Sequence, residues 1–188
     1  MKQYKVLAIV PYMGLKEILN VVKSEYSELN ISVVVENMNY PEKIENIVKN
    51  NTYDLIISRG GVLKYIKTLV NIPCIDFKIT LYDVVRTIKL LNTFGSKKAM
   101  IIGAINLESC GEFIKDYFEK DIPVRTVNSF EETEGVVKKA AEDGYEVVIG
   151  DNAAWRCAKE NGMPAILLMN GEESVREALD TARDILNC

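Results

Sequence analysis

Apolar residues follow two different spacings along the whole chain. Short continuous apolar runs are typical of buried strands, and longer segments with apolar residues every three or four positions are typical of amphipathic helices. The predicted strands span residues 5–12, 31–37, 53–58, 72–77, 97–104, 122–127, 145–150 and 163–169. The predicted helices span residues 15–29, 41–50, 60–70, 80–94, 106–120, 129–144, 151–162 and 171–187. Because several strands are apolar throughout, we expect an α/β fold with parallel sheets covered by helices on both faces.

The chain also contains an internal repeat. The segment "YDLIISRGGVLKYIKTLVNIPCIDF" resembles "YEVVIGDNAAWRCAKENGMPAILLM" in its strand, turn, helix and closing strand. We therefore predict two similar three-layer α/β/α lobes, at residues 1–79 and 80–170, followed by a terminal helix at 171–188. That helix either closes the second lobe or crosses back onto the first, and the sequence leaves both possibilities open.

Composition narrows the possible functions. The chain of 188 residues has a net charge of -4, a pI of about 5.1 and no histidine. The acidic balance argues against a nucleic-acid-binding surface, and the lack of histidine excludes Ser-His-Asp and Cys-His catalysis and histidine-ligated metals. No apolar run is long enough for a membrane helix, and no signal peptide is evident, so we expect a cytoplasmic protein. We also expect neither a cofactor nor a metal.

The stretch Ser58-Arg59-Gly60-Gly61 is the first candidate binding site. It follows a buried strand and opens a helix, and ligands of open parallel sheets bind beyond the carboxyl ends of the strands. Two glycines would let a ligand approach the first helical amides, and the arginine fork fits a carboxylate or a phosphate. The alternative is a plain tight turn with the arginine in solvent.

Other strand ends could contribute to the same ligand. Tyr12 and Gly14 follow the first strand, and the turn from Gly103 to Asn106 follows the fifth. The repeat makes Gly150, Asp151 and Asn152 the second lobe's equivalent of the Ser58–Gly61 turn, so both turns are expected to line a cleft between the lobes. Asp151 is also a predicted helix N-cap. Asp83 is a candidate acid, but with Thr80 it also fits a capping box.

Taken together, these motifs resemble one known family. The residues that carry the resemblance are Ser58-Arg59-Gly60-Gly61, the Tyr82-Asp83 pair, Gly150-Asp151 and the block from Gly171 to Ser174. The chain resembles, over nearly its whole length, the N-terminal sensor domain of propionate catabolism activators, which are sigma-54-dependent transcriptional regulators. The resemblance implies two α/β lobes in a chelatase-like or periplasmic-binding-protein-like arrangement and adds Tyr82 to the candidate ligand contacts.

The resemblance also implies a function. The propionate activators respond to a methylcitrate-type tricarboxylate, and complete regulators continue into an ATPase module and a helix-turn-helix. This chain has no G-x-x-x-x-G-K-[ST] loop, so we do not expect it to bind ATP through one. From the resemblance we expect a sensor, either a fragment or stand-alone, that binds a small anionic metabolite and forms a dimer.

Two alternatives remain open at this stage. One is a racemase- or lyase-like enzyme, although Cys74 and Cys157 do not fall at matching strand ends and Cys110 falls inside a predicted helix. The other is a dimerisation module that binds no ligand.

Overall fold

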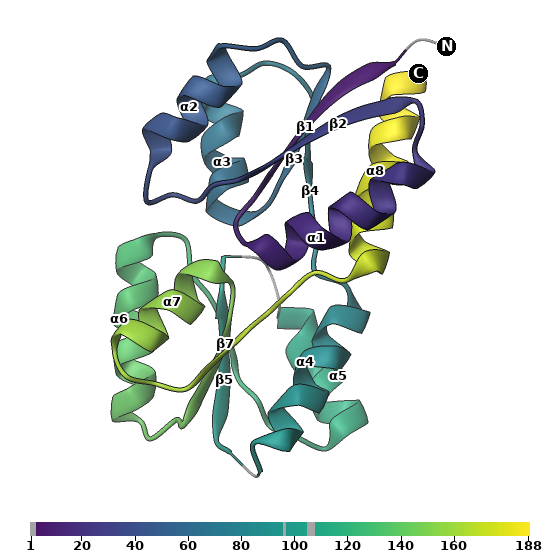
Figure 1. Ribbon diagram of the computed structural model, residues 1–188. Coiled ribbons are helices and arrows are strands. Elements are labelled where there is room, and N and C mark those ends of the chain that lie inside the picture. Colours follow the sequence, from purple (N-terminus) through teal and green to yellow (C-terminus); the bar gives the residue numbers. More distant parts are fainter. Residues whose placement is uncertain (1–2, 96, 105–107) are drawn as a thin grey trace. The chain divides into compact units, whose positions relative to one another are not determined.

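The computed structural model describes residues 3–95, 97–104 and 108–188 (Figure 1). The chain divides into two compact units, one formed by Met1–Thr80 with Asn170–Cys188 and the other by Leu81–Met169. Each unit contains a four-stranded parallel sheet with helices on both faces, as the continuously apolar strands predict.

The first unit is built on a sheet with the strand order β2-β1-β3-β4. Its strands are β1 (Tyr4–Val10), β2 (Leu29–Val35), β3 (Leu55–Ser58) and β4 (Cys74–Asp76). Helices α1 (Met13–Val22) and α8 (Glu172–Asn187) pack on one face, and α2 (Pro41–Lys49) and α3 (Gly60–Leu69) pack on the other.

The last helix, whose position the sequence left open, completes the core of the first unit. Its buried residues Val175, Ala178 and Leu179 recur every three or four positions and pack in one cluster with residues of α1 and the sheet. The Arg176 guanidinium also donates to both carboxylate oxygens of Glu25, with nitrogen–oxygen distances of 3.2 and 2.6 Å. Apolar packing and this ion pair therefore both attach α8 to the first unit.

The predicted helix at 15–29 is too long. In the structure α1 ends at Val22, a short 3-10 turn η1 (Lys23–Glu25) follows, and Leu29 already begins β2. Tyr26 and Leu29 are both buried in the same apolar cluster as α1. Their spacing from Val22 fits the apolar face of a longer helix. In the structure the turn brings the same two side chains to the same core.

The second unit repeats this architecture with the strand order β6-β5-β7-β8. Its strands are β5 (Ala99–Gly103), β6 (Val124–Thr126), β7 (Val147–Gly150) and β8 (Ala165–Leu167). Its helices are α4 (Leu81–Thr93), α5 (Glu108–Phe118), α6 (Phe130–Glu142) and α7 (Asn152–Glu160). Helices α6 and α7 pack on one face of the sheet, and α4 and α5 lie on the other (Figure 1).

The two sheets confirm the predicted α/β repeat. Ile57 of β3 pairs with Ile75 of β4, and in the second sheet Ile149 of β7 pairs with Ile166 of β8. The third and fourth strands of each sheet thus share one register, so Ser58 and Gly150 are equivalent last residues of equivalent strands.

Local signals in the sequence place several helix starts. Proline at the first position begins α2 at Pro41. Ser129 caps α6 by accepting a hydrogen bond from the Glu132 amide at 3.1 Å, as its capping box predicts. The Glu132 carboxylate accepts in return from the amide of Asn128, one residue before the expected donor. Across the described ranges, no helix is both long enough and apolar enough to cross a bilayer.

Candidate functional site

The candidate site lies where the strands of the first sheet end, which we call the carboxyl edge. Strand β1 occupies an inner position: the chain runs from β1 to β2 through α1, and then from β2 past β1 to β3 through α2, so the strand order reverses at β1. In open α/β sheets such a reversal of strand order opens the crevice in which ligands bind. Tyr12 follows β1 at this point, and Arg59 follows β3.

The end of β3 is held firmly in place. The hydroxyl of the fully buried Ser58 donates to the carbonyl of Ile9 at 2.7 Å, which joins β3 to β1. The amide of Phe77 donates to the Ser58 carbonyl at 2.9 Å, which joins β3 to β4. Ser58 therefore positions the next residue, Arg59, rather than presenting its own hydroxyl to a ligand.

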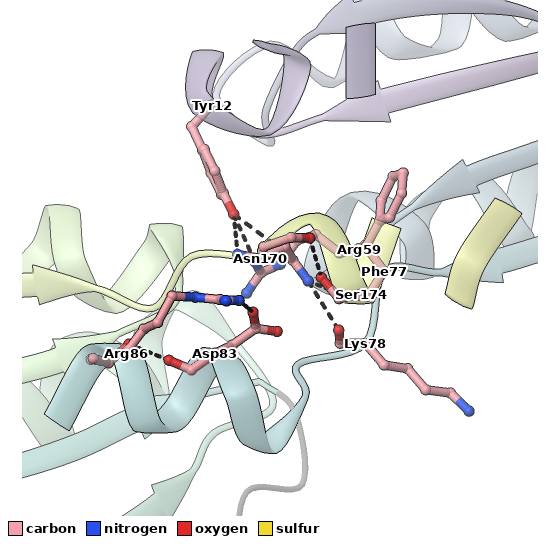
Figure 2. Close-up of polar contacts among 10 residues, drawn as sticks. Tyr12, Arg59, Phe77, Lys78, Asp83, Arg86, Asn170 and Ser174 are labelled. Atoms are coloured by element: carbon pink, nitrogen blue, oxygen red, sulfur yellow. Dashed lines mark hydrogen bonds and ion pairs between the residues drawn. The ribbon is translucent and has the colours of Figure 1, made fainter. Parts of the chain in front are cut away.

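Arg59 is a buried cation. Only 4% of its surface is exposed, so the alternative of an arginine in solvent is wrong. Its Nη1 donates to the Tyr12 hydroxyl at 3.2 Å and to Oδ1 of Asn170 (Figure 2). A guanidinium withdrawn from water needs strong acceptors, which makes its surroundings suited to a carboxylate or a phosphate.

The two glycines after Arg59 differ in what they require. Gly60 has a φ of 56°, a left-handed conformation, and a Cβ placed there would meet no atom within 4 Å. Glycine is needed at this position for the backbone angle and not for space. At Gly61 a Cβ would lie 3.6 Å from Cγ of Met38, an ordinary van der Waals contact, so this glycine is not required by the described fold.

Asn170 completes the group, and the sequence did not identify it. Its backbone amide donates to the Tyr12 hydroxyl at 2.9 Å, and its Nδ2 donates to the carbonyls of Phe77 at 3.2 Å and Lys78 at 3.0 Å. Only 2% of Asn170 is exposed. Its position shortly after β8 and just before α8 was a usable signal, because this is another strand end followed by a helix. We call Tyr12, Arg59 and Asn170 the arginine cluster.

Asp76 is an acidic neighbour at the same edge. It pairs with Ser58 in the sheet register, and its Oδ1 is enclosed without a hydrogen-bond donor among the described residues. Burial raises the pKa of the Asp76 carboxyl, against the lowering effect of the charges on Arg59, Lys67 and Lys78.

Replacing Asp76 with asparagine is expected to stabilise the first unit at neutral pH. Because the pKa of the folded state lies above that of the unfolded state, the wild-type protein loses stability as the pH rises through the folded pKa. Asparagine carries no charge at any pH, so its advantage should shrink in mildly acidic solution. Urea unfolding at the two pH values measures this difference. A loss of stability at neutral pH would instead show that the ionised carboxylate is favourably paired.

The predicted residues of the second unit lie around the equivalent strand ends. Asp151 caps α7, because its Oδ1 accepts from the amides of Ala153 at 3.1 Å and Ala154 at 3.0 Å. Its Oδ2 accepts from the amide of Ala104 at 2.8 Å, which ties the end of β5 to the start of α7. Both carboxylate oxygens therefore have structural partners.

Gly150 has a steric role at the end of β7. A Cβ on Gly150 would lie 2.7 Å from Cβ of Ala154 and 3.0 Å from the amide nitrogen of Trp155. Gly103 is the buried last residue of β5, Asn152 is the first residue of α7, and Gly14 lies in the first turn of α1. The predicted turn residues Ile105 and Asn106 lie outside the described residues.

Tyr82 and Asp83 lie in the first turn of α4 and differ in exposure. Tyr82 is 66% exposed, whereas Asp83 is fully buried and forms an ion pair with Arg86. The Asp83 carbonyl also accepts from the hydroxyl of Thr87 at 2.8 Å. Asp83 thus has a structural role at the start of α4.

The sequence matches one protein family, described as propionate catabolism activator, over residues 25–188. The chain belongs to the propionate catabolism activator family. This match covers most of both units and confirms the family resemblance of the motifs. Membership supports a role in transcription regulation. No curated protein matches the chain.

A solved structure shows the same fold as this propionate catabolism activator domain. An NtrC family transcriptional regulator from Clostridium acetobutylicum is 22% identical, with a TM-score of 0.80, and the match covers 98% of this chain and 97% of that one. An aspartate racemase homologue from Pyrococcus horikoshii is 16% identical, covering 97% and 100% of the two chains at a TM-score of 0.39. The second similarity is too low to support an argument about function.

Proposed function

We propose that this member of the propionate catabolism activator family is the effector-sensing module of a sigma-54-dependent transcriptional activator. In this proposal a small anionic metabolite binds at the carboxyl edge of the first sheet. Arg59 supplies the charge, and the first amides of α3 supply directed donors at the positive end of the helix dipole.

A difference between the two repeats carries the proposal. Asp151 opens α7 and holds its carboxylate against the amides of that helix. Arg59 occupies the equivalent position before α3, and its side chain makes no cap hydrogen bond to that helix. The second unit thus has a built-in carboxylate at this helix start, where the first unit has a buried cation. A ligand carboxylate at α3 would supply the interaction that Asp151 supplies at α7.

The ligand class follows from these donors. A planar guanidinium next to helical amides favours carboxylates and phosphates over neutral ligands. The family resemblance favours a tricarboxylate of the methylcitrate type. Contributions from the second lobe, through Tyr82, Gly103 and residues 150–152, and an interlobe cleft stay predictions.

The partners are proposed on the same basis. In a complete regulator this module would act on an ATPase and a helix-turn-helix, and it would form a dimer in the cytoplasm. It would not contact nucleic acid itself, in keeping with its net charge of -4.

The cysteine chemistry does not favour the enzyme alternative. Cys74 is the first residue of β4, at the end of the strand opposite the carboxyl edge, and Cys157 is buried within α7. Burial raises the pKa of both thiols, whereas a catalytic thiol needs a lowered pKa.

The variant Gly61→Ala tests the proposed site with little effect on the fold. The added methyl group would lie 3.6 Å from Cγ of Met38, an ordinary van der Waals contact. In this proposal it also hinders the approach of a ligand to the first amides of α3. We expect wild-type protein to gain about 2.7 kcal/mol of stability at a ligand concentration a hundred times the dissociation constant, and the variant to lose most of that gain.

The measurement is thermal unfolding with citrate, 2-methylcitrate and inorganic phosphate. Gly135→Ala is the matched control, because Gly135 is exposed on α6 and its added Cβ meets no atom within 4 Å. Equal stabilisation of wild type and Gly61→Ala by the same anion would place that anion elsewhere and contradict the proposal.

A further inference from the structure

One member of the arginine cluster, Asn170, is the residue at which the chain returns to the first unit. The chain leaves the first unit after Thr80 and re-enters it at Asn170. We call residues 77–81 and 168–171 the crossover segments. Asn170 belongs to the second of them, and its Nδ2 donates to the carbonyls of Phe77 and Lys78 in the first (Figure 2). One buried side chain therefore joins both segments.

Asn170 also connects the crossover segments to Arg59. Its Oδ1 accepts from Nη1 of Arg59 and, at 3.3 Å, from the Tyr12 hydroxyl. Asn170 thus makes five hydrogen bonds, through its backbone amide and through both Oδ1 and Nδ2 of its side chain. Directly after it, Gly171 begins the capping turn of α8, where its carbonyl accepts from the Ser174 hydroxyl at 3.0 Å.

We propose that Asn170 is a latch that holds both crossover segments to Arg59, and that a carboxylate taking Nη1 of Arg59 opens it. This inference deepens the proposed function, because the ligand of that site supplies the opening force. It assigns to Asn170 the transmission of ligand binding to the start of α8.

The exchange of partners at Arg59 is chemically favourable. Nη1 carries two hydrogens and already donates to two acceptors, Tyr12 and Asn170, so a carboxylate oxygen that binds at Nη1 replaces one of them. A charged acceptor forms a hydrogen bond roughly twice as strong as a neutral amide oxygen does. Oδ1 of Asn170 keeps the Tyr12 hydroxyl as a donor after the exchange, so no buried acceptor is left without a donor.

Hydrogen exchange of the ligand-free protein tests the latch. In Asn170→Ala we expect amides in peptides covering 77–81 and 168–175 to exchange about tenfold faster, since several buried hydrogen bonds are lost. Asn161→Ala is the matched control, because Asn161 Nδ2 likewise donates to a backbone carbonyl, that of Cys157, but within the second unit. Unchanged exchange in the peptides of β1 and β3 establishes that the variants remain folded.

Two more variants separate the arms of the latch. Asn170→Asp keeps an acceptor for Arg59 but loses the donor to Phe77 and Lys78, so only the 77–81 peptide should exchange faster. Arg59→Ala removes Nη1 and imitates its capture by a ligand, so both peptides should exchange faster.

The inference is overturned if Asn170→Ala exchanges like the wild type in both peptides, or if Arg59→Ala leaves both peptides protected. None of these measurements requires a ligand. Failure of citrate, 2-methylcitrate or phosphate to bind would therefore count against the proposed function, while the exchange rates alone decide whether the latch exists.

Discussion

Replacing Arg59 with alanine is expected to remove ligand-dependent stabilisation and to lower the stability of the ligand-free protein as well. The first effect follows from the loss of the buried cation, and amounts to about 2.7 kcal/mol at a ligand concentration a hundred times the dissociation constant. The second follows because Nη1 donates to both Tyr12 and Asn170, and a hydrogen bond from a charged donor contributes about 1.5–3 kcal/mol of net stability.

Urea unfolding with and without citrate, 2-methylcitrate or phosphate separates the two effects of Arg59→Ala. Arg125→Ala is the matched control, since Arg125 is an exposed arginine on β6. It should lose neither basal stability nor the ligand effect. If Arg59→Ala lowers basal stability but is still stabilised by the same anion as the wild type, the arginine is structural and the ligand contacts other residues.

Replacing Gly150 with alanine is expected to destabilise the second unit by about 1–3 kcal/mol. The added Cβ would meet Cβ of Ala154 at 2.7 Å, the Trp155 amide nitrogen at 3.0 Å and the Ile102 carbonyl oxygen at 3.2 Å. Two of these atoms belong to the backbone and cannot move aside as a flexible side chain can. The close contact between the end of β7 and the start of α7 therefore requires glycine.

The control for Gly150→Ala is expected to have the opposite sign. Gly135→Ala places a methyl group in open space on an exposed helix and should stabilise the protein by about 0.5–1 kcal/mol. Urea midpoints of the two variants measure both effects. A Gly150→Ala protein as stable as the wild type would show that β7 and α7 can separate at no cost.

The fold was largely predictable because its signals are local. Continuously apolar strands, amphipathic helices and the repeat around Ile57 and Ile149 each depend on short segments of sequence. The exception was the helix that ends at Val22. Tyr26 and Leu29 lie beyond its end but are buried in the same core, at positions that also fit its apolar face. Spacing alone cannot distinguish these two ways of reaching one core.

The candidate site was predictable only in part. Strand ends and the repeat pointed to Arg59 and Tyr12, which the structure brings together in the first unit. They did not identify Asn170, because its partners lie about a hundred residues or more away in the sequence and only the return of α8 to the first unit brings it there. The hydrogen-bond partners of Asp151 and Arg59 were not predictable from residue types either. Asp151 accepts from a backbone amide of its helix and Arg59 donates to a distant side chain, and only the three-dimensional contacts decide this.

The most direct test of the central claim is a titration followed by two-dimensional amide NMR. Citrate, 2-methylcitrate and inorganic phosphate are each added to protein labelled with nitrogen-15, and the resonances of Gly60, Gly61 and the Arg59 side chain are followed. The account predicts that at least one of these anions shifts all three resonances along a single saturable curve, and that Arg59→Ala abolishes the shifts of both glycines. Saturable binding that leaves Gly60 and Gly61 unshifted, or no binding of any of the three anions, would contradict it.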